Sequence, residues 1–253
     1  MCCVLSGVQK LISVTLIPAF FLVLTPVGTV LLLSILVNGF SLIDTMFHEI
    51  GHTIFAWAFG YPSLPSFDLQ HGGGMSYYFK RQWMIQITGF AGAAYLCYLA
   101  HQRSNLLFGI MLTISVAYFL SAMTEFHQAI IDFMGHGFSI LTGSFFILRS
   151  LMGWTEKRRG EKWISAFLGY FIIFVNIKLI WKLIFDIDYQ EEYWNQKGSH
   201  GFGDFSKIAD YFWFKNEEPV AWFCLALCVL FLILPHAAYW HFKNLPDRPA
   251  SYH

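Results

Sequence analysis

The second apolar block of the chain, residues 41–60, has the sequence SLIDTMFHEIGHTIFAWAFG. It is long enough for a membrane helix, since about 20 residues cross a bilayer core. It nevertheless contains four ionisable side chains, Asp44, His48, Glu49 and His52. Each such group at the centre of a bilayer costs about 2.5–3.5 kcal/mol on insertion scales. The cluster therefore needs a compensating partner, and its spacing indicates which one.

His48 and His52 are four residues apart, so on a helix they project from one face with their Cβ atoms about 5–6 Å apart. The pattern H-E-x-x-H predicts that both imidazoles bind one Zn²⁺ ion while Glu49 reaches a water on that ion. Zinc lowers the pKa of such a water to about 7, and a neighbouring carboxylate accepts its proton. The motif predicts a hydrolase with His48 and His52 as metal ligands and Glu49 as the catalytic base.

A catalytic zinc site needs a third protein ligand, and the apolar run at 126–150 offers candidates. Its polar residues recur at intervals of three and four, which places them on one helix face. These residues are Glu125, Gln128, Asp132, His136 and Ser139. Asp132 and His136 can each complete the site, or one can bind the metal while the other orients the ligating residue. We prefer Asp132 as the third ligand. The glycines that flank His136 allow another backbone to approach closely.

The composition is that of a membrane protein. Hydrophobic residues make up 56% of the 253 residues and charged residues only 13%, against about 25% charged in soluble proteins. The apolar residues form blocks of about 20 rather than ten-residue alternations, which excludes an outer-membrane barrel. We therefore predict an all-α, polytopic membrane helix bundle of about six to seven transmembrane helices, integral to a lipid bilayer. Basic and acidic residues balance at 16 each, so nucleic acid is not an expected partner.

Helices are expected at 11–38, 40–60, 82–101, 105–124, 126–150, 163–185 and 219–242. Between the second and third, residues 61–81 contain prolines and three consecutive glycines, which predict a Gly-rich re-entrant or hairpin loop. An extended element at 75–79 can pair with an unwound substrate strand, so His71, Gly73 and Tyr77 are candidate substrate-binding residues.

This division predicts three parts of the chain. An N-terminal membrane helix occupies 1–39, a metallopeptidase-like membrane core occupies 40–151, and C-terminal membrane helices with an acidic loop at 186–218 occupy 152–253.

Residues 48–60, HEIGHTIFAWAFG, resemble the metal-binding helix of site-2 protease-like membrane metalloproteases, in which H-E-x-G-H precedes small and apolar residues up to a glycine. The resemblance continues through glycines 72–74 and through GFAGAA at 89–94, and covers roughly residues 40–150. It implies an intramembrane zinc peptidase that cuts membrane protein or peptide substrates. His48 and His52 would be the ligands and Glu49 the base, with an Asp from a later helix as third ligand.

The later motif of that family has an Asp followed directly by glycines, whereas FMGHG follows Asp132 here. The third ligand therefore stays open between Asp132 and His136.

Other classes compete with a peptidase. A membrane di-iron oxygenase or desaturase also uses helical histidines, but it needs more ligands, commonly in His-His pairs, and the sequence has no such pair. A metal transporter uses polar stripes as a pathway, but gives no reason for Glu49 to lie between two histidines. An inactive metal-binding membrane protein would keep the same motif. The peptidase explains all three motif residues.

Overall fold

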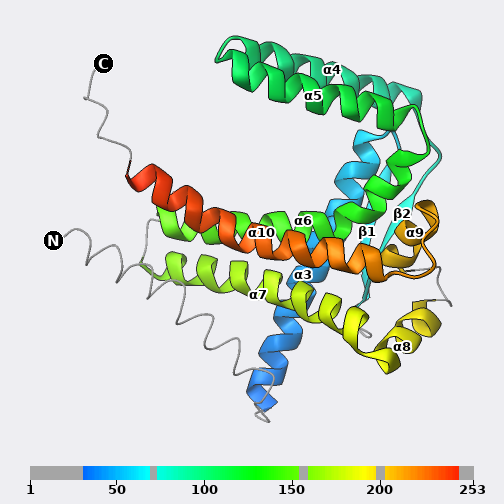
Figure 1. Cartoon of the computed structure of the whole chain (residues 1–253), viewed down its shortest axis with the longest axis vertical. Coiled ribbons are helices and arrows are strands. Elements are labelled where there is room, and N and C mark those ends of the chain that lie inside the picture. Colours follow the sequence, from blue (N-terminus) through cyan, green and yellow to red (C-terminus); the bar gives the residue numbers. More distant parts are fainter. Residues whose placement is uncertain (1–30, 69–72, 154–158, 198–202, 245–253) are drawn as a thin grey trace. The chain divides into compact units, whose positions relative to one another are not determined.

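A computed structural model describes residues 31–68, 73–153, 159–197 and 203–244. These residues form eight helices and one two-stranded antiparallel sheet (Figure 1). The helices are α3 (Leu31–Ala58), α4 (Trp83–His101), α5 (Asn105–Ala122), α6 (Phe126–Met152), α7 (Arg159–Phe185), α8 (Ile187–Lys197), α9 (Asp204–Tyr211) and α10 (Glu218–Lys243). The strands are β1 (Ser63–Asp68) and β2 (Gly73–Tyr78). The predicted all-α bundle with a hairpin loop is confirmed.

Five of these helices, α4, α5, α6, α7 and α10, are long and apolar enough to cross a membrane. Their bounds agree with the sequence expectation to within a few residues. Lipid offers no hydrogen-bond partners, so an apolar run of this length must pair its own backbone groups, and it does so as a helix. The protein is therefore integral to a membrane.

Helix α3 starts before the expected 40–60 helix and runs through the predicted boundary at 39/40. Gly39 costs about 1 kcal/mol relative to Ala in a helix, which is too little to end one. The expected helix at 11–38 otherwise lies mostly outside the described residues.

The end of α3 is set by Gly60, which has a φ of 89°. The Tyr61 N–H donates to Ala56 O at 2.8 Å, and the Gly60 N–H donates to Trp57 O at 3.0 Å. This pair of bonds is a Schellman cap, whose left-handed position favours glycine. The cap turns the chain directly into β1.

The chain divides into two compact units. One of them comprises residues 45–138 and 191–220, and it contains every residue of the predicted site that the structure describes. In it, β1 and β2 pair from Ser63↔Tyr78 to Asp68↔Gly73. Helices α4 and α5 lie side by side as a hairpin (Figure 1). A small core of Ala56, Phe59, Ala122 and Ile131 joins α3, α5 and α6.

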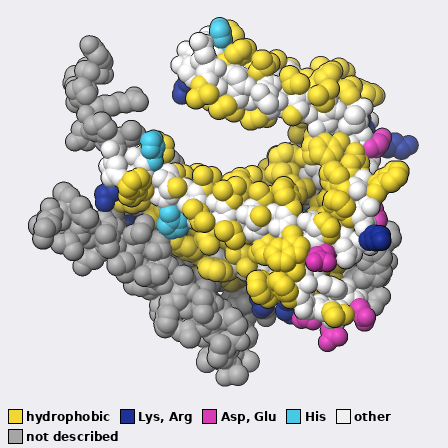
Figure 2. All heavy atoms as spheres, viewed as in Figure 1, with side chains coloured by type: hydrophobic (Ala, Val, Ile, Leu, Met, Phe, Trp, Pro, Cys, Tyr) yellow, Lys and Arg dark blue, Asp and Glu magenta, His cyan; other side chains and the backbone are white. Residues whose placement is uncertain are grey.

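The α4–α5 hairpin is apolar along its whole length, and Figure 2 shows hydrophobic side chains covering it. Only 17% and 11% of the two helices' apolar windows are buried in the protein. Because neither helix carries a Lys, Arg, Asp or Glu, these surfaces suit contact with lipid.

Of the described residues, the other unit comprises 31–44, 139–153, 159–190 and 221–244. Here Gly143 of α6 meets Gly169 of α7, and a Cβ on Gly143 would lie 3.0 Å from Gly169 O. The two glycines therefore allow the helix backbones to touch. Tyr170 of α7 hydrogen-bonds His236 of α10 at 2.9 Å, which connects these two helices.

Candidate metal centre

The two histidines of the α3 motif lie one turn apart, with their Nε2 atoms 3.0 Å from each other. His52 is 4% exposed, and its Nδ1–H donates to the backbone carbonyl of Ile131 at 2.7 Å. Because a carbonyl only accepts, this bond places the proton of a neutral His52 on Nδ1 and leaves a lone pair on Nε2. His52 is therefore oriented as a metal ligand would be.

Glycines allow α6 to lie directly against these imidazoles. A Cβ on Gly135 would overlap His52 Nε2 and lie 2.7 Å from His48 Nε2. On the facing helix, a Cβ on Gly51 would overlap the carbonyl oxygen of Met134. Only glycine permits such a close backbone approach, so these two positions set the spacing of α3 and α6.

A third group reaches the same point from α9. Asp204 Oδ2 lies 2.9 Å from His48 Nε2 and 3.2 Å from His52 Nε2. Burial alone would raise the pKa of the Asp204 carboxyl, but the imidazoles of His52 and His48 hold this pKa well below its usual range. The carboxylate is therefore ionised, as metal binding requires.

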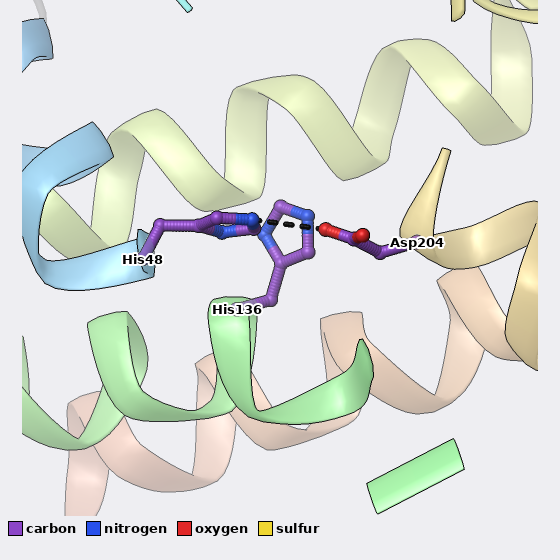
Figure 3. Close-up of side chains that lie close together, drawn as sticks. All are labelled: His48, His136 and Asp204. Carbon is purple, nitrogen blue, oxygen red and sulfur yellow. Dashed lines mark hydrogen bonds and ion pairs between the residues drawn. The ribbon is translucent and has the colours of Figure 1, made fainter. Parts of the chain in front are cut away.

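His136 of α6 also lies close to His48 and Asp204. Ligand atoms of His48, His136 and Asp204 all lie within 4.8 Å of one another, and Figure 3 shows the three side chains converging from α3, α6 and α9. The His48 and His136 rings are edge to face, with centroids 4.5 Å apart.

This donor set fits a divalent metal. Ligand atoms about 2.0–2.1 Å from a tetrahedral zinc are separated by about 3.3–3.4 Å. The separations among His48 Nε2, His52 Nε2 and Asp204 Oδ2 are 2.9, 3.0 and 3.2 Å. Lone pairs facing each other at such distances repel unless a proton or a cation lies between them. Two imidazoles and a carboxylate are a known zinc donor set.

Glu49 lies beside these ligands and is 5% exposed. The Ser76 hydroxyl of β2 is 2.7 Å from Glu49 Oε2, to which it donates. A Cβ on Gly74 would lie 2.5 Å from Glu49 Cγ, so β2 passes directly over this side chain. The hairpin therefore orients the carboxylate next to the candidate ligand atoms.

Residues 12–239 match the family described as Peptidase M50B-like. The chain belongs to the M50B-like peptidase family. The resemblance to site-2 protease-like proteins is thereby confirmed. No curated protein and no solved structure matches the chain with significance.

The other predicted site residues of this M50B-like protein lie in different places. Asp132 Oδ1 is 3.7 Å from Lys207 Nζ, and the same ammonium is 4.0 Å from Asp204 Oδ1. Gly73 has open space beside it, and Tyr77 is 56% exposed. His71 lies outside the described residues.

Asp204 was not among the predicted ligands of the M50B-like site, because it falls in the segment interpreted as an acidic loop. That segment contains α8 and α9. In α9, residues 204–211 read DFSKIADY and bury Phe205, Ile208 and Ala209. Apolar residues at intervals of three and four are typical of a helix packed on one face. From this pattern the sequence could have predicted a helix that begins at Asp204 and packs one face against the protein.

Proposed function

We propose that this protein is a zinc-dependent peptidase that hydrolyses peptide bonds of membrane protein substrates within or beside the bilayer. The observation that carries the proposal is the meeting of His48, His52 and Asp204 beside the buried Glu49. Their three ligand atoms lie within 3.2 Å of one another. Membership of a peptidase family supports the same reaction class.

In this proposal His48, His52 and Asp204 would hold the metal, and three protein ligands are the number that catalytic zinc sites use, with a fourth position for water or substrate. If His136 also ligated, four protein groups would close the site. We therefore assign His136 to the edge of the open position. We assign Asp132, the preferred ligand from sequence, to orienting Asp204 through Lys207.

A zinc ion held there supplies Lewis-acid polarisation of a water and of the peptide carbonyl. Glu49 accepts a proton from the water as the water oxygen bonds to the carbonyl carbon. Glu49 then returns this proton to the amide nitrogen as the C–N bond breaks, which yields a carboxylic acid and an amine. Ser76 keeps Glu49 aimed at the attacking water.

The substrate must be extended near the site, because the carbonyls of an intact helix are hydrogen-bonded and shielded. The Phe79 N–H donates to Pro62 O at 2.8 Å. Bonded and non-bonded pairs alternate in an antiparallel ladder, so the N–H groups of Gly74, Ser76 and Tyr78 point away from β1. In the part of the chain that the structure describes, the sheet has only two strands. We propose that the unwound substrate pairs with this edge of β2.

Hydrolysis by purified protein in proteoliposomes tests the proposal. A mixture of single-span membrane peptides is incubated in water enriched in ¹⁸O, and the products are identified by mass spectrometry. Wild type is expected to yield products whose new carboxyl carries ¹⁸O, and Glu49→Gln is expected to yield none. A zinc chelator should abolish cleavage and added zinc should restore it.

Cleavage by Glu49→Gln equal to wild type would overturn the assignment of the base. Bound iron with oxidised rather than hydrolysed products would favour an oxygenase.

A further inference from the structure

The face of β2 that lies over Glu49 is defined by alternate residues. Side chains alternate between the two faces of a strand, so Gly74, Ser76 and Tyr78 share one face, and Tyr77 points to the other. Gly74 and Ser76 both contact Glu49. Ser76 Oγ also lies 3.5 Å from Thr53 Oγ1 of α3. Tyr78 is therefore presented on the side of the hairpin that faces the candidate metal centre.

The charged groups near Tyr78 agree with this placement. Its phenol interacts electrostatically with Asp132, Asp204 and Glu49, and it is hydrogen-bonded to Ser76. Partial burial, followed by these three carboxylates, raises the pKa of Tyr78 well above its usual range. Because the single Ser76 proton is donated to Glu49, the Tyr78 O–H is the donor in its bond to Ser76. In the proposal below, this O–H turns from Ser76 to the substrate. Tyr78 is also 44% exposed, so a substrate can reach it.

Peptide hydrolysis needs such a donor. When water adds to the peptide carbon, the carbonyl oxygen becomes an oxyanion, and a fixed hydrogen-bond donor stabilises this charge most when it is already in place. The Ser76 hydroxyl is already donated to Glu49. The Lys207 ammonium faces Asp132 and Asp204. Tyr78 supplies a neutral donor on the Glu49 side of the site.

We propose that Tyr78 is a catalytic residue whose hydroxyl donates a hydrogen bond to the substrate carbonyl oxygen as it becomes an oxyanion. This inference rests on the proposed peptidase function.

The test compares Tyr78→Phe with wild type in the proteoliposome assay. Loss of one oxyanion donor is expected to lower kcat about 10²–10³-fold, with KM changed less than about threefold, because the bond forms fully only in the transition state. Zinc content should stay at that of wild type. The matched control is Tyr95→Phe, which removes a hydroxyl from an exposed tyrosine of α4 and should leave kcat unchanged.

A second readout needs no turnover. A phosphinic peptide has the tetrahedral shape and charge of the adduct, and transition-state analogues lose affinity in parallel with kcat/KM. Tyr78→Phe should bind it about 10²-fold more weakly than wild type, measured by displacement of a fluorescent analogue.

The outcomes separate the two claims. A Tyr78→Phe variant with wild-type kcat and wild-type phosphinic peptide affinity overturns the role of Tyr78 and leaves the peptidase intact. Loss of zinc from Tyr78→Phe also overturns it, because Tyr78 would then be a structural support. A wild-type protein that neither cleaves peptides nor binds the analogue overturns the peptidase itself.

Discussion

His48 Nε2 and Asp204 Oδ2 lie 2.9 Å apart although 156 residues separate them along the chain. The first side chain comes from the long helix α3 and the second from the first residue of the short helix α9 (Figure 3). No local spacing connects them, so their meeting is a property of the fold. A half-buried imidazole and carboxylate held this close require each other or a shared cation.

The spacing of α3 and α6 depends on Gly135, so Gly135→Ala should disturb the metal centre. The new methyl would occupy the space of His52 Nε2 and His48 Nε2. Overpacking of this kind costs typically about 1–3 kcal/mol of folding free energy, and it should also displace the imidazoles. Thermal unfolding in detergent and zinc content measure both effects. Gly92→Ala is the control, since Gly92 has open space around it, and equal behaviour of the two variants would contradict the close approach.

Removing the Ser76 hydroxyl should slow the reaction without removing metal. Hydrogen bonds to charged groups contribute about 1.5–3 kcal/mol, so loss of the bond that aims Glu49 should lower kcat roughly 10–100-fold in Ser76→Ala. Zinc stoichiometry should not change, because Ser76 contacts Glu49 and no proposed ligand. Ser66→Ala, on the partner strand opposite Met75, controls for general damage to the hairpin. An unchanged kcat in Ser76→Ala would show that the hairpin does not orient Glu49.

The roles of Asp132 and His136 are separated by their effect on zinc affinity. If Asp132 orients Asp204 through Lys207, Asp132→Asn should weaken zinc binding about 10–100-fold, as outer-shell substitutions do, and still give a loaded protein at excess zinc. His136→Gln should likewise retain zinc if His136 borders the open position. Competition with a fluorescent zinc chelator measures the affinities. Complete loss of zinc in either variant would make that residue the ligand.

Pairing of the substrate with β2 predicts an alternating sensitivity to backbone methylation. A methyl group on a substrate nitrogen that faces β2 removes a hydrogen bond worth about 0.5–1.5 kcal/mol and prevents close approach. Synthetic substrates N-methylated at successive positions should therefore show raised KM at every second position. A uniform effect along the peptide would argue against strand addition.

Much of the fold could be predicted from the sequence because membrane helices carry long apolar runs. Helices α4, α5, α6, α7 and α10 were expected at nearly their observed bounds, since each run is bracketed by charged or turn-forming residues. The start of α3 was not, because two helices were expected, at 11–38 and 40–60, and one helix continues through the boundary between them.

The site was only partly predictable for a different reason. His48, Glu49 and His52 identify themselves by helical spacing, and the polar stripe of α6 indicated that His136 faces inward. Asp204 has no spacing relation to them, and its acidic segment resembled a solvated connection. Phe205 and Ile208 are buried, so this segment contains an amphipathic helix, α9. Its first residue, Asp204, lies beside the two histidines.

The metal content of the purified protein tests the central claim most directly. Mass spectrometry is applied to wild type, Asp204→Ala, Glu49→Gln and, as control, Asp210→Ala at the exposed end of α9. The proposed site predicts one zinc per chain in wild type, Glu49→Gln and Asp210→Ala, and its loss in Asp204→Ala. Zinc retained in Asp204→Ala, or no zinc in wild type, would contradict it.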